Sequence, residues 1–360
     1  MSFIKNLFGR LLHGNRVRVR DEAATDALDE IEDLDPSASA SEEYVDTEAD
    51  EDPNEGDDAI DLESPPIRLD RWFYPWLLDF SAFADLSLSQ SEARVLDAFE
   101  QLVTGQKSSS TLVPRLPMVI PQLMRSLKDD TMTGAQLARQ ITRDPVLVGE
   151  VIRVANSPYY RRARKISNIE QAVVLLGRDG LHQLVARVAF YPIFNLKSGH
   201  VTNLAASRVW MQSERCALVC HCLAEQRGQD VFSAYLAGLV ANVGLMVGFR
   251  LMDQVLDKQL DPIPNSGAFY RVFIERSRQL SHRIIDEWNF PESVIQAIDE
   301  QANPEPSAAR SWLGAILDVA DQYAKLNLLV EKQRLPEDEV DAAMFMSEPC
   351  YRRLLIDVQN

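Results

Sequence analysis

The chain has 360 residues, of which 46% are hydrophobic and 25% are charged, and its net charge is −17. No apolar run approaches the roughly eighteen residues that cross a membrane, so we expect no spanning helix. The charge is unevenly distributed, because residues 21–63 carry −20 and residues 1–20 carry +5. Residues 64–360 therefore carry only −2, and a nearly neutral folded part does not indicate general nucleic-acid binding.

The first 65 residues divide into two predicted segments. Residues 1–20 have apolar side chains at helical spacing, with Lys5 and Arg10 off that stripe, which predicts a basic amphipathic helix. Such a helix can lie peripherally on an anionic membrane, dock in a partner's groove, or have no partner. Residues 21–65 are predicted to be a disordered acidic linker, because their few large hydrophobic side chains cannot offset chain entropy.

Residues 66–106 are predicted to form a helical N-terminal extension. Trp72, Phe73, Trp76 and Phe80 are spaced to pack a helix onto a larger body. The Ser- and Pro-containing stretch "QKSSSTLVPRLP" then predicts a linker.

Helix start and stop signals follow one another after this linker. Asp144 is predicted to cap a helix that opens with Pro145. Ser167 and Glu170 predict a capping box, and Gly177 is expected at the end of that helix. With no strand alternation and no internal repeat, the pattern predicts an all-α fold.

Two further helices are predicted in the second half. The stretch "AASRVWMQSERCALVCHCLAEQRG" predicts one long helix that ends at Gly228. The stretch "AYLAGLVANVGLMV" predicts an apolar helix that breaks off around Ala241 and Asn242. The nearby glycines are expected to allow close helix packing, and they are Gly238, Gly244 and Gly248.

The four cysteines predict no disulfide framework, because Cys216, Cys220 and Cys222 lie within seven residues and Cys350 is far away. A metal site built from these three cysteines and His221 is also disfavoured, since Cys222 lies about 200° around the helix from Cys220. One helix cannot close a tetrahedral site from such positions. We therefore expect buried small side chains in a reducing cytoplasm, and the N-terminus is a poor signal peptide.

From about Arg115 to about Ala302 the chain resembles the HDOD family, the HD-related output domains of bacterial signalling. The likeness rests on a Leu-Pro…Pro start in "RLPMVIPQLM", an Asp-Pro helix start, an Ala-Asn-Ser turn and the stretch "IEQAVVLLG", in that order. It implies an HD-like helical domain over residues 107–305, with residues 306–360 completing or capping it. The family-motif residues, structural or interacting, are Asp144, Pro145, Ala155, Asn156, Ser157, Gly177, Trp288 and Pro291.

Asn156 has two open interpretations. Together with Ser157 before Pro158 it can end a helix, because the residue before proline is pushed out of the α region. It could instead contact a ligand.

The second half resembles an HD phosphohydrolase core, in which His and Asp side chains bind one or two divalent metals that activate water. The family ligand positions are substituted here, by Gln212, Ala241, Asn242, Ser277, Glu300 and Gln301. Asp321 alone remains where a late aspartate is expected. Because Ala241 has no donor atom and Asn242 offers only a neutral amide, the resemblance implies no catalytic residue, metal or cofactor.

A basic cluster follows the Ala-Asn-Ser turn and is a candidate interaction patch. It consists of Arg161, Arg162, Arg164 and Lys165, beside Tyr159 and Tyr160. It can be a solvated loop, or it can engage phosphate, single-stranded nucleic acid or an acidic protein segment. Residues 21–63 of the same chain would qualify as that acidic segment, which suggests an autoinhibitory tether.

The remaining histidines do not have metal-ligand spacing, and we expect packing or surface roles for them. They are His13, His182, His200 and His282.

These observations predict a non-catalytic cytoplasmic signalling module that acts on signalling proteins of unknown identity. Residues 1–20 could add a peripheral attachment to a membrane or a partner. Two alternatives remain open: a metal-dependent phosphohydrolase or phosphodiesterase with relocated ligands, and a nucleotide-binding sensor without turnover.

Overall fold

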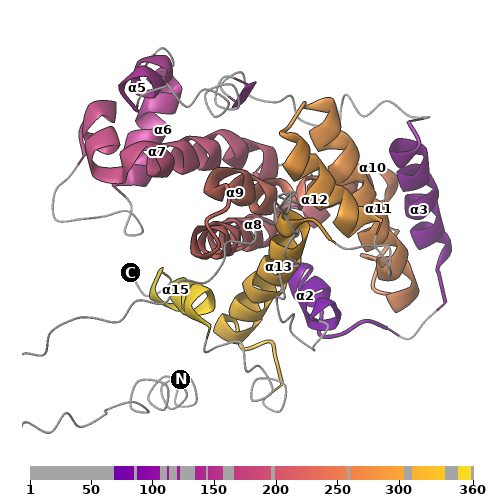
Figure 1. Ribbon diagram of the computed structural model, residues 1–360. Helices are drawn as coiled ribbons and strands as arrows, with labels where there is room; N and C mark the ends of the chain where they lie inside the picture. The colour runs from indigo at the N-terminus through magenta and orange to yellow at the C-terminus, as the bar shows by residue number, and fades with distance from the viewer. Residues whose placement is uncertain are drawn as a thin grey trace, which may run out of the picture. The chain divides into compact units, whose positions relative to one another are not determined.

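The computed structural model describes residues 69–84, 87–105, 112, 120–121, 134–142, 145–156, 166–195, 199–257, 260–303, 310–336 and 348–357. Every regular element in these ranges is an α-helix, which confirms the predicted all-α fold (Figure 1). The predicted amphipathic segment 1–20 and the acidic linker 21–65 lie outside the described residues. The same holds for Asp144, Ser157, and the basic cluster of residues 161–165.

The described part of the chain contains the following helices, in chain order. Their bounds are α2 (Asp70–Leu77), α3 (Gln90–Val103), α5 (Gly134–Ile141), α6 (Pro145–Ala155), α7 (Ile169–Phe194), α8 (His200–Gln226), α9 (Val231–Val240), α10 (Val243–Val255), α11 (Gly267–Glu287), α12 (Glu292–Ala302), α13 (Trp312–Glu331) and α15 (Pro349–Asp357).

The N-terminal extension packs onto the second half of the chain. Phe73 and Trp76 of α2 are buried, and α2 lies beside α8 and α13. Helix α3 begins with a capping box, in which Ser89 Oγ accepts from Glu92 N at 3.2 Å and Ser89 N donates to Glu92 Oε2 at 2.9 Å. The other oxygen of Glu92 accepts from the backbone N–H groups of Asn265 and Ser266, which ties α3 to the start of α11.

Asn156 joins the end of α6 to the start of α7. Its Nδ2 donates to the carbonyl oxygens of Ile152 at 2.8 Å and Ile166 at 2.7 Å, and its Oδ1 accepts from Ile166 N at 2.8 Å. These three bonds end α6 and hold residues 156 and 166 together. In the structure the Asn156 side chain therefore has a structural role, because it bonds the end of α6 to the residues just before α7.

The start of α7 corrects one prediction and refines another. Asn168, not Ser167, caps the helix, and its Oδ1 accepts from Gln171 N at 2.8 Å. At Gly177 the backbone leaves the helical conformation with φ 70°, a region that favours glycine, but helical structure resumes at once. Gly177 therefore marks a kink inside α7, whereas we expected the end of a helix.

Helices α8 to α13 form the core. Helix α8 ends as predicted before Gly228, which has a φ of 64°. Helices α9 and α10 are separated at Ala241 and Asn242, where the sequence predicted a break. A side chain at Gly238 would meet the backbone of α8, and one at Gly244 would meet α11, so both positions require glycine for this packing.

Residues 231–255, which span α9 and α10, are apolar and long enough to cross a membrane by length and composition. However, 83% of their most apolar window is buried inside the protein. We interpret this stretch as part of the core.

The C-terminal helices pack against the same core. Helix α13 lies along α8, α9 and α12, and α15 lies against α8 and α13. A disulfide joins Cys222 of α8 to Cys350 of α15, with a Cα–Cα distance of 5.7 Å. The expectation that no disulfide forms was therefore wrong, because the fold brings together two cysteines separated by 128 positions. Cys216 and Cys220 are free and buried, in line with a packing role.

Candidate functional site

Most of the residues that we predicted at HD ligand positions meet in one place. Gln212 on α8, Asn242 between α9 and α10, Ser277 on α11 and Asp321 on α13 lie around the junction of these helices. The space left among them is about 20 Å³, which is room for about one water molecule and no organic ligand. Its lining residues are Tyr74, Ala241, Asn242, Leu245, Ile274, Ser277, Arg278, Ser281, Gln301, Asp321 and Lys325.

A chain of polar contacts runs through this junction and ends on a buried ammonium group. Asn242 Nδ2 donates to Gln212 Oε1, and Gln212 Nε2 donates to Asp321 Oδ1 at 2.6 Å. The other oxygen of Asp321 lies 2.6 Å from Lys325 Nζ. Lys325 Nζ also donates to Asp70 Oδ1 of α2 at 2.7 Å. We call these five residues the lysine cluster.

The ammonium group of Lys325 remains charged although only 3% of its side chain is exposed. Burial lowers the pKa of Lys325, but the carboxylates of Asp321 and Asp70 outweigh burial and hold this pKa well above its ordinary value. Burial raises the pKa of the neighbouring Tyr74 to about 12, so its hydroxyl stays neutral. Arg278 adds a second positive charge, with its guanidinium 4.0 Å from Asp70. The positive charges of Lys325 and Arg278 therefore face the carboxylates of Asp70 and Asp321.

The side chains of the neighbouring serines form hydrogen bonds with backbone groups. Ser277 Oγ donates to Phe273 O at 2.7 Å, within its own helix. Ser281 Oγ donates to Ala241 O at 2.7 Å and accepts from Gly244 N at 2.9 Å, which holds the break between α9 and α10 against α11.

The Glu300 carboxylate binds the start of α13 and does not join the lysine cluster. Its carboxylate accepts from Ser311 N at 3.0 Å and from Ser311 Oγ at 3.1 Å, where Ser311 caps α13. Gln301, by contrast, lines the space at the lysine cluster. Glu300 therefore stabilises the start of α13, whereas Gln301 faces the junction.

The residues at this junction do not fit a catalytic divalent metal. A metal needs several lone pairs free to converge on it. Here Asp321 already accepts from Gln212 and faces Lys325, and the positive charge of that ammonium would repel a cation. The described part of the chain also contains no group of three or more His, Cys, Asp or Glu side chains placed to hold a metal ion.

The described histidines have ordinary partners or positions. His182 is buried beside Phe232, and the ring centroids are 5.4 Å apart. His282 Nδ1 lies 3.7 Å from Asp299 Oδ1, and His200 begins α8.

Two members of the lysine cluster were missed from the sequence. Lys325 follows Asp321 by four residues, so both lie on one face of a strongly apolar helix, and this pair was a detectable signal. Asp70 gave no comparable signal, because it is 255 positions from Lys325 and the two meet only in the fold.

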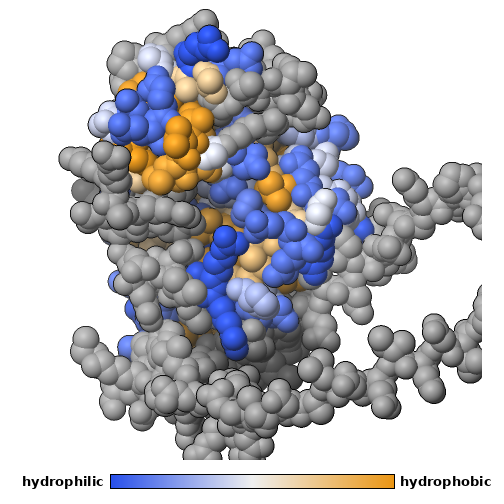
Figure 2. All heavy atoms as spheres, turned by 60° about the vertical axis from the view of Figure 1, so that its left-hand side comes forward, coloured by the Kyte–Doolittle hydropathy of each residue, from blue (hydrophilic) through white to orange (hydrophobic). Residues whose placement is uncertain are grey.

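A second, shallower hollow lies on the side of the molecule formed by α6, α7 and α8. Its volume is about 240 Å³, and its lining includes Val154, Val188, Tyr191 and Trp210. Apolar residues gather among polar ones on the side that carries α5, α6 and α7, which Figure 2 turns forward. Val174 of α7 is 88% exposed.

A family model described as the HDOD domain matches residues 113–304, which is more than half of the chain. The chain belongs to the HDOD family. This family is related to the HD phosphohydrolases. The match excludes α2 and α13, so Asp70, Asp321 and Lys325 come from helices outside the family domain.

Two solved structures share the HDOD fold of this chain. An HDOD protein of unknown function from Geobacter sulfurreducens is 22% identical with a TM-score of 0.53, and the match covers 74% of this chain and 94% of that one. A protein from Shewanella amazonensis SB2B, described provisionally as a metal-dependent phosphohydrolase, is 17% identical with a TM-score of 0.52, covering 75% and 99%. At these identities the likeness shows the fold alone.

An uncharacterized protein of Treponema pallidum (strain Nichols) is 23% identical over 242 residues. This match covers 64% of the chain but 45% of that relative, so the chain matches less than half of the relative's length.

Proposed function

We propose that the chain is a non-catalytic regulatory module of bacterial signal transduction that acts through contacts with other proteins. The observation that carries the proposal is the lysine cluster. An internal ammonium and its two carboxylates lie at the junction of residues that the resemblance predicts at HD ligand positions, the amide of Asn242 bonds to that of Gln212, and the amide of Gln212 bonds to Asp321. Without a metal to lower the pKa of water, the junction lacks the hydroxide on which HD hydrolysis depends.

The test is metal content combined with turnover. The full chain is purified, incubated with Mn²⁺, Fe²⁺, Ni²⁺ or Zn²⁺, dialysed and analysed for bound metal. It is then assayed on bis-p-nitrophenyl phosphate and on cyclic dinucleotides. The proposal expects substoichiometric metal and no turnover above that of a Gln212→Ala control. Stoichiometric metal with turnover that Gln212→Ala abolishes would establish the alternative, a phosphohydrolase with relocated ligands.

For the partner, we propose an acidic protein segment that binds the basic cluster of residues 161–165. The cations and neighbouring tyrosines of that cluster suit carboxylates, and the chain's own residues 21–63 carry −20. In this proposal the acidic tract competes with the partner and acts as an autoinhibitory tether. Deletion of residues 1–65 should raise affinity for an acidic peptide at low salt and lose that advantage at high salt. Equal affinities at both salt concentrations would refute the tether.

We place this function in the cytoplasm, with residues 1–20 as a site of peripheral attachment to a membrane or a partner. The proposal rests on the match to the HDOD family, because the resemblance implies a bacterial signalling role. Fractionation of cells that express the full chain and a deletion of residues 1–20 tests the attachment. Loss of membrane association on deletion is the expected result.

A further inference from the structure

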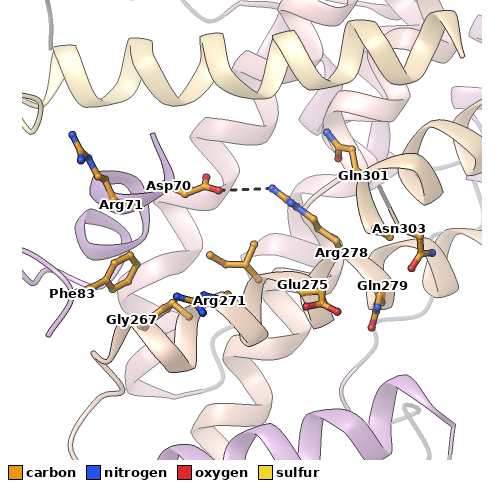
Figure 3. Close-up of a pocket in the computed structure, with 13 residues that line it drawn as sticks. Asp70, Arg71, Phe83, Gly267, Arg271, Glu275, Arg278, Gln279, Gln301 and Asn303 are labelled. Atoms are coloured by element: carbon orange, nitrogen blue, oxygen red, sulfur yellow. Dashed lines mark ion pairs between the residues drawn. The ribbon is translucent and has the colours of Figure 1, made fainter. Parts of the chain in front are cut away.

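A large open pocket adjoins the lysine cluster. It lies between the first turn of α2, one face of α11 and the C-terminal end of α12, and its volume is about 950 Å³ (Figure 3). Pockets of this size hold small organic ligands. Arg278 and Gln301 line both the pocket and the small space at the lysine cluster, so they form the wall between the two.

The pocket carries more positive than negative charge. Its charged lining residues are the cations Arg71, Arg271 and Arg278 and the anions Asp70 and Glu275. Figure 3 shows Arg278 pointing toward Asp70. Arg71 lies over the ring of Trp72, with 3.7 Å between the guanidinium carbon and the ring centroid. Arg271, on the exposed side of α11, makes no ion pair or hydrogen bond through its side chain within the described residues. Its guanidinium is therefore available to an anion from outside.

Phe83 gives the wall an apolar surface, and its half-buried ring packs on the buried ring of Tyr270. The rings of Phe83 and Tyr270 are 5.0 Å apart between centroids and tilted by 33°. Amide side chains of Gln279, Gln301 and Asn303 line the rest of the wall, and these groups can both donate and accept hydrogen bonds. The combination suits a ligand that joins an anionic group to a planar heterocycle.

One wall of this pocket does not come from the family domain. Asp70, Arg71 and Phe83 precede the matched residues 113–304, whereas α11 and α12 lie inside them. The N-terminal extension of this chain therefore adds a wall to one face of the HDOD domain and makes it an open pocket.

We propose that this pocket binds a nucleoside monophosphate. Arg271 and Arg278 bind the phosphate by charge-assisted hydrogen bonds, because a planar guanidinium matches two phosphate oxygens. Phe83 stacks on the base, and Glu275, which lies between the two arginines along α11, accepts from ribose hydroxyls. Binding requires neither a metal nor turnover, so this inference stands apart from the proposed function.

The experiment is calorimetric titration of the full chain with AMP, GMP, CMP and UMP. At least one nucleotide should bind saturably, and its nucleoside and ribose 5-phosphate should each bind at least about tenfold more weakly, equivalent to about 1.4 kcal/mol. Arg271→Gln should weaken the nucleotide about tenfold. Arg352→Gln removes the same charge from an exposed position on α15 and should leave affinity unchanged.

Three outcomes would overturn the proposal. The first is no saturable binding by any of the four nucleotides up to millimolar concentration. The second is equal affinity of wild type and Arg271→Gln, both with unchanged melting temperatures, because the ligand would then sit elsewhere. The third is ribose 5-phosphate binding as tightly as the nucleotide, which would remove the role of the aromatic wall. Phe83→Leu tests that wall independently and should weaken the nucleotide but not ribose 5-phosphate.

Discussion

The helices inside the HDOD match and the helices that flank it contribute differently to the same junction. Helices α8 to α11 supply one charge, Arg278, and the neutral side chains that we predicted at HD ligand positions, chiefly Gln212, Asn242 and Ser277. Helices α2 and α13 supply the other charges, from Asp70, Asp321 and Lys325. The comparison teaches that a buried cation and its two carboxylates occupy the junction where we predicted substituted metal ligands.

The largest expected effect comes from removing that cation. Lys325→Met leaves Asp70 and Asp321 buried without their shared partner, which should lower the free energy of unfolding by about 3–5 kcal/mol. Lys332→Met, which removes an exposed lysine from the end of the same helix, should cost less than about 1 kcal/mol. Urea unfolding measures both. Equal losses in the two variants would show that the cluster has no special role.

Removing one flanking carboxylate should have a smaller effect, because Asp321 remains beside Lys325. Asp70→Asn is expected to cost about 1–3 kcal/mol and to speed hydrogen exchange in α2. The control Asp79→Asn changes an exposed carboxylate with a φ of 67°, a conformation that asparagine tolerates. Exchange in α2 that stays unchanged in Asp70→Asn would mean that the extension is held by its apolar contacts alone.

A second contact between the extension and the family domain should depend on pH. Burial raises the pKa of Glu92, but hydrogen bonds from Ser89 and Ser266 outweigh it and hold this pKa below its ordinary value. A carboxylate with a lowered pKa stabilises the fold above its unfolded-state pKa, and this stability is lost as pH falls through the folded-state pKa. Glu92→Gln should cost about 1–2 kcal/mol at pH 7 and progressively less toward pH 3. A cost that is the same at both pH values would contradict the assignment.

The smallest expected effect concerns α15. Besides the disulfide, α15 is held by the buried side chains of Tyr351 and Leu354. The ring centroids of Tyr351 and Tyr323 are 5.7 Å apart. Cys350→Ser should therefore change the free energy of unfolding of the core by less than about 1 kcal/mol and mainly increase proteolysis near α15. Reduction of the wild type with dithiothreitol should reproduce this pattern. Unfolding of α8 on reduction would show that the bond holds the core.

The sequence predicted the helical fold because its signals are local. The break at Ala241 and Asn242 and the end of α8 at Gly228 follow from residue types in one short stretch each. The predicted cap was Ser167 but the observed cap is Asn168. Both residue types can cap a helix, and only the backbone conformation decides which of two neighbours does so. Such boundary errors leave the architecture unchanged.

The candidate site was predicted only in part, without Lys325 and Asp70. The resemblance placed Gln212, Asn242 and Asp321 at one site, and these three are hydrogen-bonded in the structure. The charge that occupies the site comes from contacts between residues far apart in the chain, as does the disulfide between Cys222 and Cys350. Spacing along a sequence does not reveal which helices will lie side by side.

The most direct measurement of the central claim is a crystal structure of the full chain grown in MnCl₂, with anomalous diffraction data. We predict no manganese peak at the junction and Lys325 Nζ within hydrogen-bonding distance of both Asp70 and Asp321. A manganese ion between the helices that bear Gln212 and Asn242, held by three or more protein atoms with Lys325 turned away, would contradict the account.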